Sequence, residues 1–156
     1  MLAASKYMSK ILLKIIAQDH VVSETEVDSV TLETVEGQIT ILPNHIPLVS
    51  QLKVGEAMVI NNGKSESMAI AGGFVEVGNN RILILADRAE RAEEIDILRA
   101  EEAHKRAEEK LAEFKNRDDV EYVNLAAQLE KELARVKIAR KHSHTHSHGS
   151  DQSMIK

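Results

Sequence analysis

The chain changes character within one stretch, Leu85-Ala-Asp-Arg-Ala-Glu-Arg-Ala-Glu-Glu-Ile95-Asp-Ile-Leu-Arg-Ala100, which continues as a charged segment to Arg106. Both prolines and all glycines except Gly149 lie before it. Because glycine and proline mark turns, we expect a turn-rich fold before this stretch and helices after it. Alanines are the only apolar residues between positions 86 and 94, and they bury little surface. We therefore predict a hinge at residues 87–95.

The composition limits the classes of protein that fit. The chain has 156 residues, of which 43% are hydrophobic and only 3% aromatic, so we expect a folded, aliphatic core. It has no cysteine, which excludes disulfides and thiolate metal sites. The net charge of -5 argues against nucleic acid as a partner, because nucleic-acid binding needs a concentrated basic face. No apolar run approaches the roughly 18 residues of a membrane span.

Short apolar or alternating segments precede the hinge and predict β-strands. They are residues 11–16, 21–27, 30–35, 38–42, 57–60, 65–71, 74–77 and 81–85. Turn signals separate them, including Asn62-Gly63, which is typical of a tight hairpin, and Gly72-Gly73. Many short strands at this spacing predict an antiparallel β-sandwich over residues 10–86.

Two amphipathic helices are predicted after the hinge. Roughly half of residues 87–141 are charged, and small or apolar residues recur every three or four positions from Ala100 to Phe114 and from Tyr122 to Val136. Residues 116–119 offer a helix stop and an N-cap between them. The fold class is therefore α+β, a sandwich followed by an antiparallel two-helix hairpin over residues 87–141.

Both ends of the chain lack a packing pattern. We expect residues 1–9 to form an N-terminal extension and residues 142–156 to form a disordered, His-rich tail. His142, His144, His146 and His148 could chelate a divalent cation. Adventitious affinity of a flexible tail explains them better, so we expect no metal site.

Three motifs together resemble one family. Residues 37–49 (Gly-Gln-Ile-Thr-Ile-Leu-Pro-Asn-His-Ile-Pro-Leu-Val), 71–77 and 85–100 match, in order and spacing, the ε subunit of bacterial-type F-type ATP synthases. The resemblance covers residues 10–140. It implies a non-catalytic subunit whose sandwich sits on the γ subunit and the c-subunit ring, at the cytoplasmic face of the bacterial plasma membrane. It also implies a hairpin that extends toward the α and β subunits and then inhibits ATP hydrolysis.

The first motif also contains the candidate docking residues. His45 lies between Pro43 and Pro47, which stiffen the backbone and present the side chain on a loop. By the resemblance, these residues and Gln38 dock on γ and the c ring. Gln38 stands where the family commonly has an acidic residue, and Asn44 where it usually has glycine. The alternative is a turn that only closes the sandwich.

Basic residues on both predicted helices form a candidate anion site. Arg99 and Arg106 share a helix face about 10 Å apart along the axis. Lys131 and Arg135 are one turn apart on the second helix, so a closed hairpin could bring four cations to one polyphosphate. The alternative is a solvated face with ion pairs at helical spacing, Asp96 with Arg99 and Glu102 with Arg106.

The resemblance implies that the ligand is ATP, acting as a regulatory ligand rather than a substrate. The positions that match the family's ATP-binding motif are Glu90, Ile95, Asp96, Arg99, Ala100, Arg106, Lys131 and Arg135. Lys131 stands where tight-binding members have arginine, which predicts weaker binding because an ammonium cannot make a forked contact.

No catalytic motif is apparent in the sequence. Besides a regulatory rotor subunit, the sequence leaves open a stand-alone nucleotide-binding module and a metal-handling protein. Stable association with γ favours the first class. ATP binding without that association favours the second, and metal uptake that depends on the tail favours the third.

Overall fold

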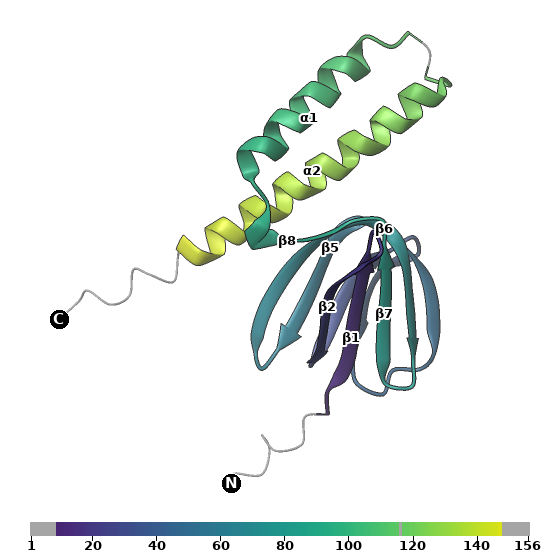
Figure 1. Cartoon of the computed structure of the whole chain (residues 1–156), viewed down its shortest axis with the longest axis vertical. Coiled ribbons are helices and arrows are strands. Elements are labelled where there is room, and N and C mark those ends of the chain that lie inside the picture. Colours follow the sequence, from purple (N-terminus) through teal and green to yellow (C-terminus); the bar gives the residue numbers. More distant parts are fainter. Residues whose placement is uncertain (1–8, 116, 148–156) are drawn as a thin grey trace, which may run out of the picture. The chain divides into compact units, whose positions relative to one another are not determined.

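The computed structural model describes residues 9–115 and 117–147 (Figure 1). The chain divides into two compact units, the first ending at Glu90 and the second beginning at Arg91. The predicted extension is described only at residue 9, and the predicted tail only as far as residue 147.

The first unit is built from one strongly folded sheet. Its strands are β1 (Ile11–Ala17), β2 (His20–Val27), β3 (Ser29–Thr34), β4 (Gly37–Ile41), β5 (Leu48–Asn61), β6 (Lys64–Gly78), β7 (Arg81–Ala86) and β8 (Ala89–Arg91). The order is β2-β1-β7-β6-β5-β3-β4, with β8 paired to β6. Although β2 and β5 are not paired, they contact each other, so the sheet folds over into a sandwich. The pair β1 and β7 is parallel, and the other strand pairs of the main path are antiparallel.

Burial alternates along β1, β3 and β7, which contribute much of the sandwich core. Along β1, Ile11, Leu13 and Ile15 are buried, while the residues between them are only partly buried. This is the pattern of a sheet with one dry face. Thr34 is the buried polar residue of the described sandwich, and its hydroxyl donates to the carbonyl of Gly37 over 2.7 Å. The core is aliphatic, as the composition predicts.

Two long strands replace several predicted short ones. β5 begins at Leu48 rather than Ala57, and β6 passes through Gly72 and Gly73, where a turn was predicted. Both glycines have positive φ, +80° and +119°, and a Cβ on Gly73 would lie 2.0 Å from the carbonyl oxygen of Leu85. The glycine pair therefore lets β6 lie close against β7 instead of ending the strand.

The predicted hinge at 87–95 contains ordered structure. Asp87 donates from its backbone N–H to Gly72 O (3.3 Å), and Ala71 donates to Arg88 O (2.9 Å). β8 follows, and then a single 3-10 turn, Ala92–Glu94. The first residues of the predicted hinge are thus held on the sandwich, and the division between the two units falls after Glu90.

The second unit is a helical hairpin made of α1 (Ile97–Ala112) and α2 (Val120–Ser147) (Figure 1). Ala100 and Ala107 are buried, as the predicted narrow seam requires. Phe114 and Tyr122 meet edge to face at 6.0 Å near the helix connection. At the start of α2, Asp119 Oδ1 accepts from the Glu121 N–H over 3.0 Å, which confirms the predicted N-cap.

α2 continues six residues beyond the predicted helix end at Lys141. The Ser143 hydroxyl donates to Arg140 O and the Thr145 hydroxyl to Lys141 O, at 2.8 Å and 2.9 Å. Both hydroxyls thus bond to carbonyls of the preceding helical turn, a pattern that Ser and Thr adopt inside helices. Residues 142–147, predicted as part of the disordered tail, are therefore helical, while 148–156 lie outside the described residues. Within the described part, no helix is long and apolar enough to cross a membrane.

Candidate docking loop and nucleotide site

Residues 42–47, called the docking loop below, connect β4 to β5 and include Pro43, His45 and Pro47. The His45 N–H donates to Leu42 O over 3.1 Å and closes a turn. The His45 Nδ1 lies 2.7 Å from the carbonyl oxygen of Ile46. A carbonyl can only accept, so Nδ1 is the donor in this contact. Asn44 has φ +62°, a conformation that glycine and asparagine adopt most readily, so asparagine suits this position.

Apolar side chains surround the loop and face solvent. The exposed fractions are 55% for Leu42, 75% for Ile46 and 72% for Val49 at the start of β5. Exposed apolar residues gathered on one stiff segment are typical of a protein-docking surface. Gln38 lies apart from them on β4, where its Nε2 donates to Glu33 Oε1 of β3 over 2.7 Å.

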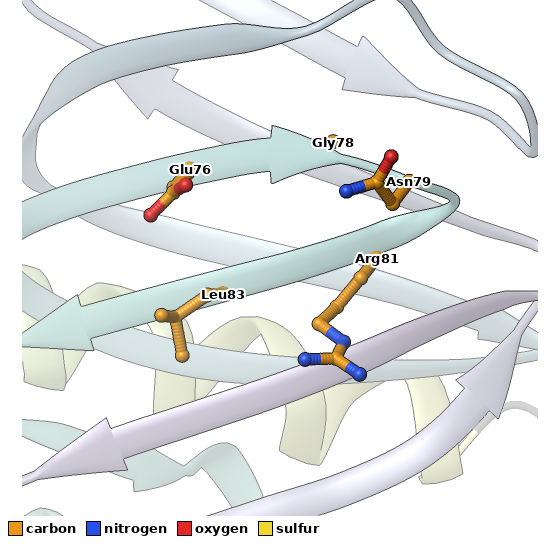
Figure 2. Close-up of a pocket in the computed structure, with 5 residues that line it drawn as sticks. All are labelled: Glu76, Gly78, Asn79, Arg81 and Leu83. Atoms are coloured by element: carbon orange, nitrogen blue, oxygen red, sulfur yellow. The ribbon is translucent and has the colours of Figure 1, made fainter.

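The outward face of β6 and β7 adds further exposed apolar surface. Phe74 and Leu85 are register partners on these strands and are both about half exposed. Toward the β6–β7 turn lies an open hollow of about 400 Å³, where Figure 2 shows Arg81 and Leu83 on β7, Glu76 on β6 and Asn79 in the turn. One carboxylate and one guanidinium on an open surface do not make a catalytic constellation.

Asp96 organises the start of the candidate nucleotide site. Its Oδ1 accepts from the Arg99 N–H over 3.1 Å and caps α1. Its Oδ2 lies 3.5 Å from Arg99 Nε, although 86% of the Arg99 side chain remains exposed. The motif thus forms a cap and a local ion pair at once. Ile95 and Ala100 are buried on either side of it.

Arg106 and Arg135 also have carboxylate partners on their own helices. Arg106 Nη1 lies 3.9 Å from Glu102 Oε2, and Arg135 Nη1 lies 2.7 Å from Glu132 Oε2. The ion pairs of Arg99 and Arg106 are those expected of a solvated helix face. An anion would have to compete with these carboxylates.

The hairpin places two of the four cations, Arg106 and Arg135, at one level along its axis. Glu101 Oε1 of α1 accepts from Arg140 Nε of α2 over 3.0 Å, which fixes the antiparallel alignment of the helices. Arg106 is five residues further along α1 and Arg135 five residues back along α2, so the two lie at the same height. Lys131 is one turn beyond, and Arg99 lies about 10 Å away along the axis in the opposite direction.

Glu90, the remaining predicted ligand, lies in β8 of the sandwich unit. Its Oε2 is 3.7 Å from Arg88 Nη2, and its side chain is 21% exposed. The other seven predicted residues belong to the helical unit.

Among the described residues, no group of three or more His, Asp or Glu side chains is arranged to hold a metal ion. His142, His144 and His146 are part of α2, and His148 lies outside the described residues.

Comparison with known families decides where the chain belongs. Residues 10–92 match the family described as "ATP synthase, Delta/Epsilon chain, beta-sandwich domain", and residues 93–140 match "ATP synthase, Delta/Epsilon chain, long alpha-helix domain". The chain is a member of the ATP synthase ε-chain family. It is thus a non-catalytic subunit of the central stalk of an F-type ATP synthase.

Bacterial relatives are similar over most of their length. The ATP synthase epsilon chain of Nitratidesulfovibrio vulgaris is 40% identical over 81% of this chain and 92% of its own. That of Desulforamulus reducens is 43% identical over 81% of this chain and 95% of its own. A chain of the Euglena gracilis mitochondrial ATP synthase structure, 24% identical, has the same fold with a TM-score of 0.70, covering 92% of this chain and 86% of that one.

The structure also identifies ε-chain residues that the sequence did not single out. Leu42, Ile46 and Val49 extend the candidate docking surface. The sequence could have indicated them, because apolar residues flank both prolines of the loop. Asn80 bonds to the docking loop from 36 residues away, and only the pairing of strands brings the two together.

Proposed function

We propose that this ε chain docks on the γ subunit and the c-subunit ring through its docking loop. The support is the combination of a stiff loop backbone with exposed Leu42 and Ile46 at its two ends. Apolar side chains on a pre-ordered backbone bind with a small entropy cost. The complex would hold the chain at the cytoplasmic face of the bacterial plasma membrane.

The hairpin is proposed to be the regulatory part. When extended toward the α and β subunits it inhibits ATP hydrolysis, and bound ATP holds it closed. The observation that carries this proposal is the alignment set by Glu101 and Arg140, which places Arg106 and Arg135 at one height. Only the closed hairpin offers cations of both helices to the same phosphates, and a ligand shifts an equilibrium only through such differential affinity.

A polyphosphate that binds the helical unit must compete with the ion pairs that Arg99, Arg106 and Arg135 already make. Arg99 and Arg106 are largely exposed, so their present carboxylate partners contribute little and a polyphosphate can displace them. Arg135, with 14% of its side chain exposed, is held more firmly by Glu132. We therefore expect Arg99 and Arg106 to contribute more to ATP affinity than their partners on α2.

The site is tested by titrating the isolated full-length chain with ATP in a calorimeter and measuring the affinity. Arg106→Ala should lower affinity by roughly 10- to 100-fold, the value of a charge-assisted hydrogen bond of about 1.5–3 kcal/mol. Arg99→Ala should act in the same direction. The matched control is Lys105→Ala, which removes an exposed positive charge next to Arg106 but on another helix face.

Reconstitution into an ATP synthase that lacks its ε chain then tests the switch. Both arginine variants should inhibit hydrolysis more strongly than wild type at a given ATP concentration, because the closed state is less populated. Unchanged affinity in both variants, or a loss equal to that of Lys105→Ala, would show that the site is misplaced. Reduced affinity without a change in inhibition would show that ATP does not govern the switch.

A further inference from the structure

Asn80 joins the docking loop to the body of the sandwich through its side chain. It lies in the turn between β6 and β7, far from the loop in sequence. Its Oδ1 accepts from the Asn44 N–H over 2.9 Å, and its Nδ2 donates to the carbonyl of Lys10 over 2.8 Å. Its own carbonyl accepts from the Leu12 N–H over 3.2 Å. One amide therefore connects three separate segments of the chain.

The loop has little else to hold it. Its two internal bonds, from the His45 N–H to Leu42 O and between the His45 ring and Ile46 O, fix its own shape. Within the part of the chain that the structure describes, the bond from Asn44 to Asn80 is the hydrogen bond that joins residues 42–47 to the rest of the sandwich. The shape of the loop is thus set internally, whereas its position depends on the strands at its two ends and on the bond to Asn80.

We propose that Asn80 is a positioning residue that holds the docking loop ready for its partner. This inference rests on the proposed docking function and adds a residue that does not itself touch the partner. The physical reason is that a loop ordered before binding loses less conformational entropy on association. Exposed Leu42 and Ile46 are carried by this loop, so both would be displaced when the bond is lost.

The neighbouring Asn79 provides a matched control. Asn79 and Asn80 occupy the same turn, and both have positive φ, +50° and +55°. Glycine is free of strain at both positions, so Asn80→Gly and Asn79→Gly change the backbone equally. Only the first substitution removes the bond to the loop.

A conservative variant separates the two halves of the Asn80 amide. Asn80→Asp keeps an oxygen that can accept from the Asn44 N–H but loses the N–H that donates to Lys10. If the loop-facing bond is what matters, Asn80→Asp restores binding. A role confined to anchoring β1 predicts that Asn80→Asp fails as Asn80→Gly does.

The experiment measures three quantities on full-length variants: hydrogen exchange of the Asn44 amide, the midpoint of urea unfolding, and affinity for a purified complex of γ with the c ring. Asn80→Gly should speed exchange at Asn44 at least tenfold and weaken affinity about five- to tenfold, relative to Asn79→Gly. Asn80→Asp should recover most of both losses. The unfolding midpoint reports whether any loss of affinity only follows a loss of stability.

Ile46→Ala, a direct change on the loop, separates the two proposals. If Ile46→Ala weakens binding and Asn80→Gly does not, the positioning role is refuted while docking through the loop stands. If Asn44 exchange does not respond to Asn80→Gly, the positioning role is refuted whatever the affinities are. If Ile46→Ala leaves affinity unchanged, the docking proposal fails, and the positioning role fails with it.

Discussion

Gly73 should be the least replaceable glycine of the sandwich, and alanine there should destabilise the fold for two separable reasons. The first reason is the backbone. With φ +119°, Gly73 occupies a region that side-chain-bearing residues adopt only at a cost of about 1–3 kcal/mol. The second is contact, because an added Cβ would lie 2.0 Å from Leu85 O and 2.8 Å from Ala86 Cα.

The contact cost follows from the pairing of the strands. An ordinary Cβ contact is 3.4 Å or longer, so β6 and β7 must separate by about 1.4 Å around Gly73, the difference between 3.4 and 2.0. Such a shift breaks the hydrogen bonds around the Gly73 and Ala86 pair, each worth about 0.5–1.5 kcal/mol. Adding two lost bonds to the backbone term gives a total of about 2–6 kcal/mol.

Gly37 allows the two reasons to be measured apart. Its φ, +124°, is nearly that of Gly73, but a Cβ there meets nothing within 4 Å. Urea unfolding of Gly37→Ala should therefore show the backbone cost alone, and Gly73→Ala should exceed it by about 1–3 kcal/mol, the value of the two broken bonds. Equal destabilisation by the two variants would refute the claim that Gly73 is required for close approach of β6 to β7.

Three further predictions concern the ion pair of Asp28 with Lys10, the boundary between the two units and the cap of α2. The hydrogen bond and ion pair from Lys10 lower the pKa of Asp28, so Asp28→Asn should reduce the free energy of unfolding at pH 7. The stability difference between wild type and variant should shrink as the pH falls below about 4, where the carboxylate becomes protonated. A difference that stays constant between pH 7 and pH 3 in urea unfolding would contradict this. Truncation after Arg91 keeps β8 and should leave a cooperatively unfolding protein that still binds γ, as calorimetry and co-purification would show. Asp119→Ala should lower helix stability by about 1 kcal/mol through loss of the α2 cap, and unchanged thermal unfolding followed by circular dichroism would argue against that role.

Local chemistry made much of this protein predictable from its sequence. Short apolar or alternating segments predicted β1, β3 and β7 to within one residue at each end, because apolar runs and a side-chain period of two are visible within a single strand. Asp119 was predictable as a cap because its carboxylate bonds to N–H groups a few residues away. The ion pairs of Arg99 and Arg106 were predictable for the same reason, since helical spacing alone brings the partners together. The family resemblance added the candidate roles of these residues.

Tertiary structure decided what depends on contacts between distant segments. The sequence indicated a turn at Gly72-Gly73, and the observed strand exists because β7 lies so close that only glycine fits. The sequence does not show that β1 pairs with β7, because the paired residues are about 70 positions apart and local periodicity does not indicate which strands are neighbours. Asn80 looked like an ordinary turn residue, and its bond to Asn44 arises only when the folded sheet brings the two turns together. The sequence determined these local elements because neighbouring residues interact whatever the rest of the chain does, whereas strand approach and loop position are set by the packed sheet as a whole.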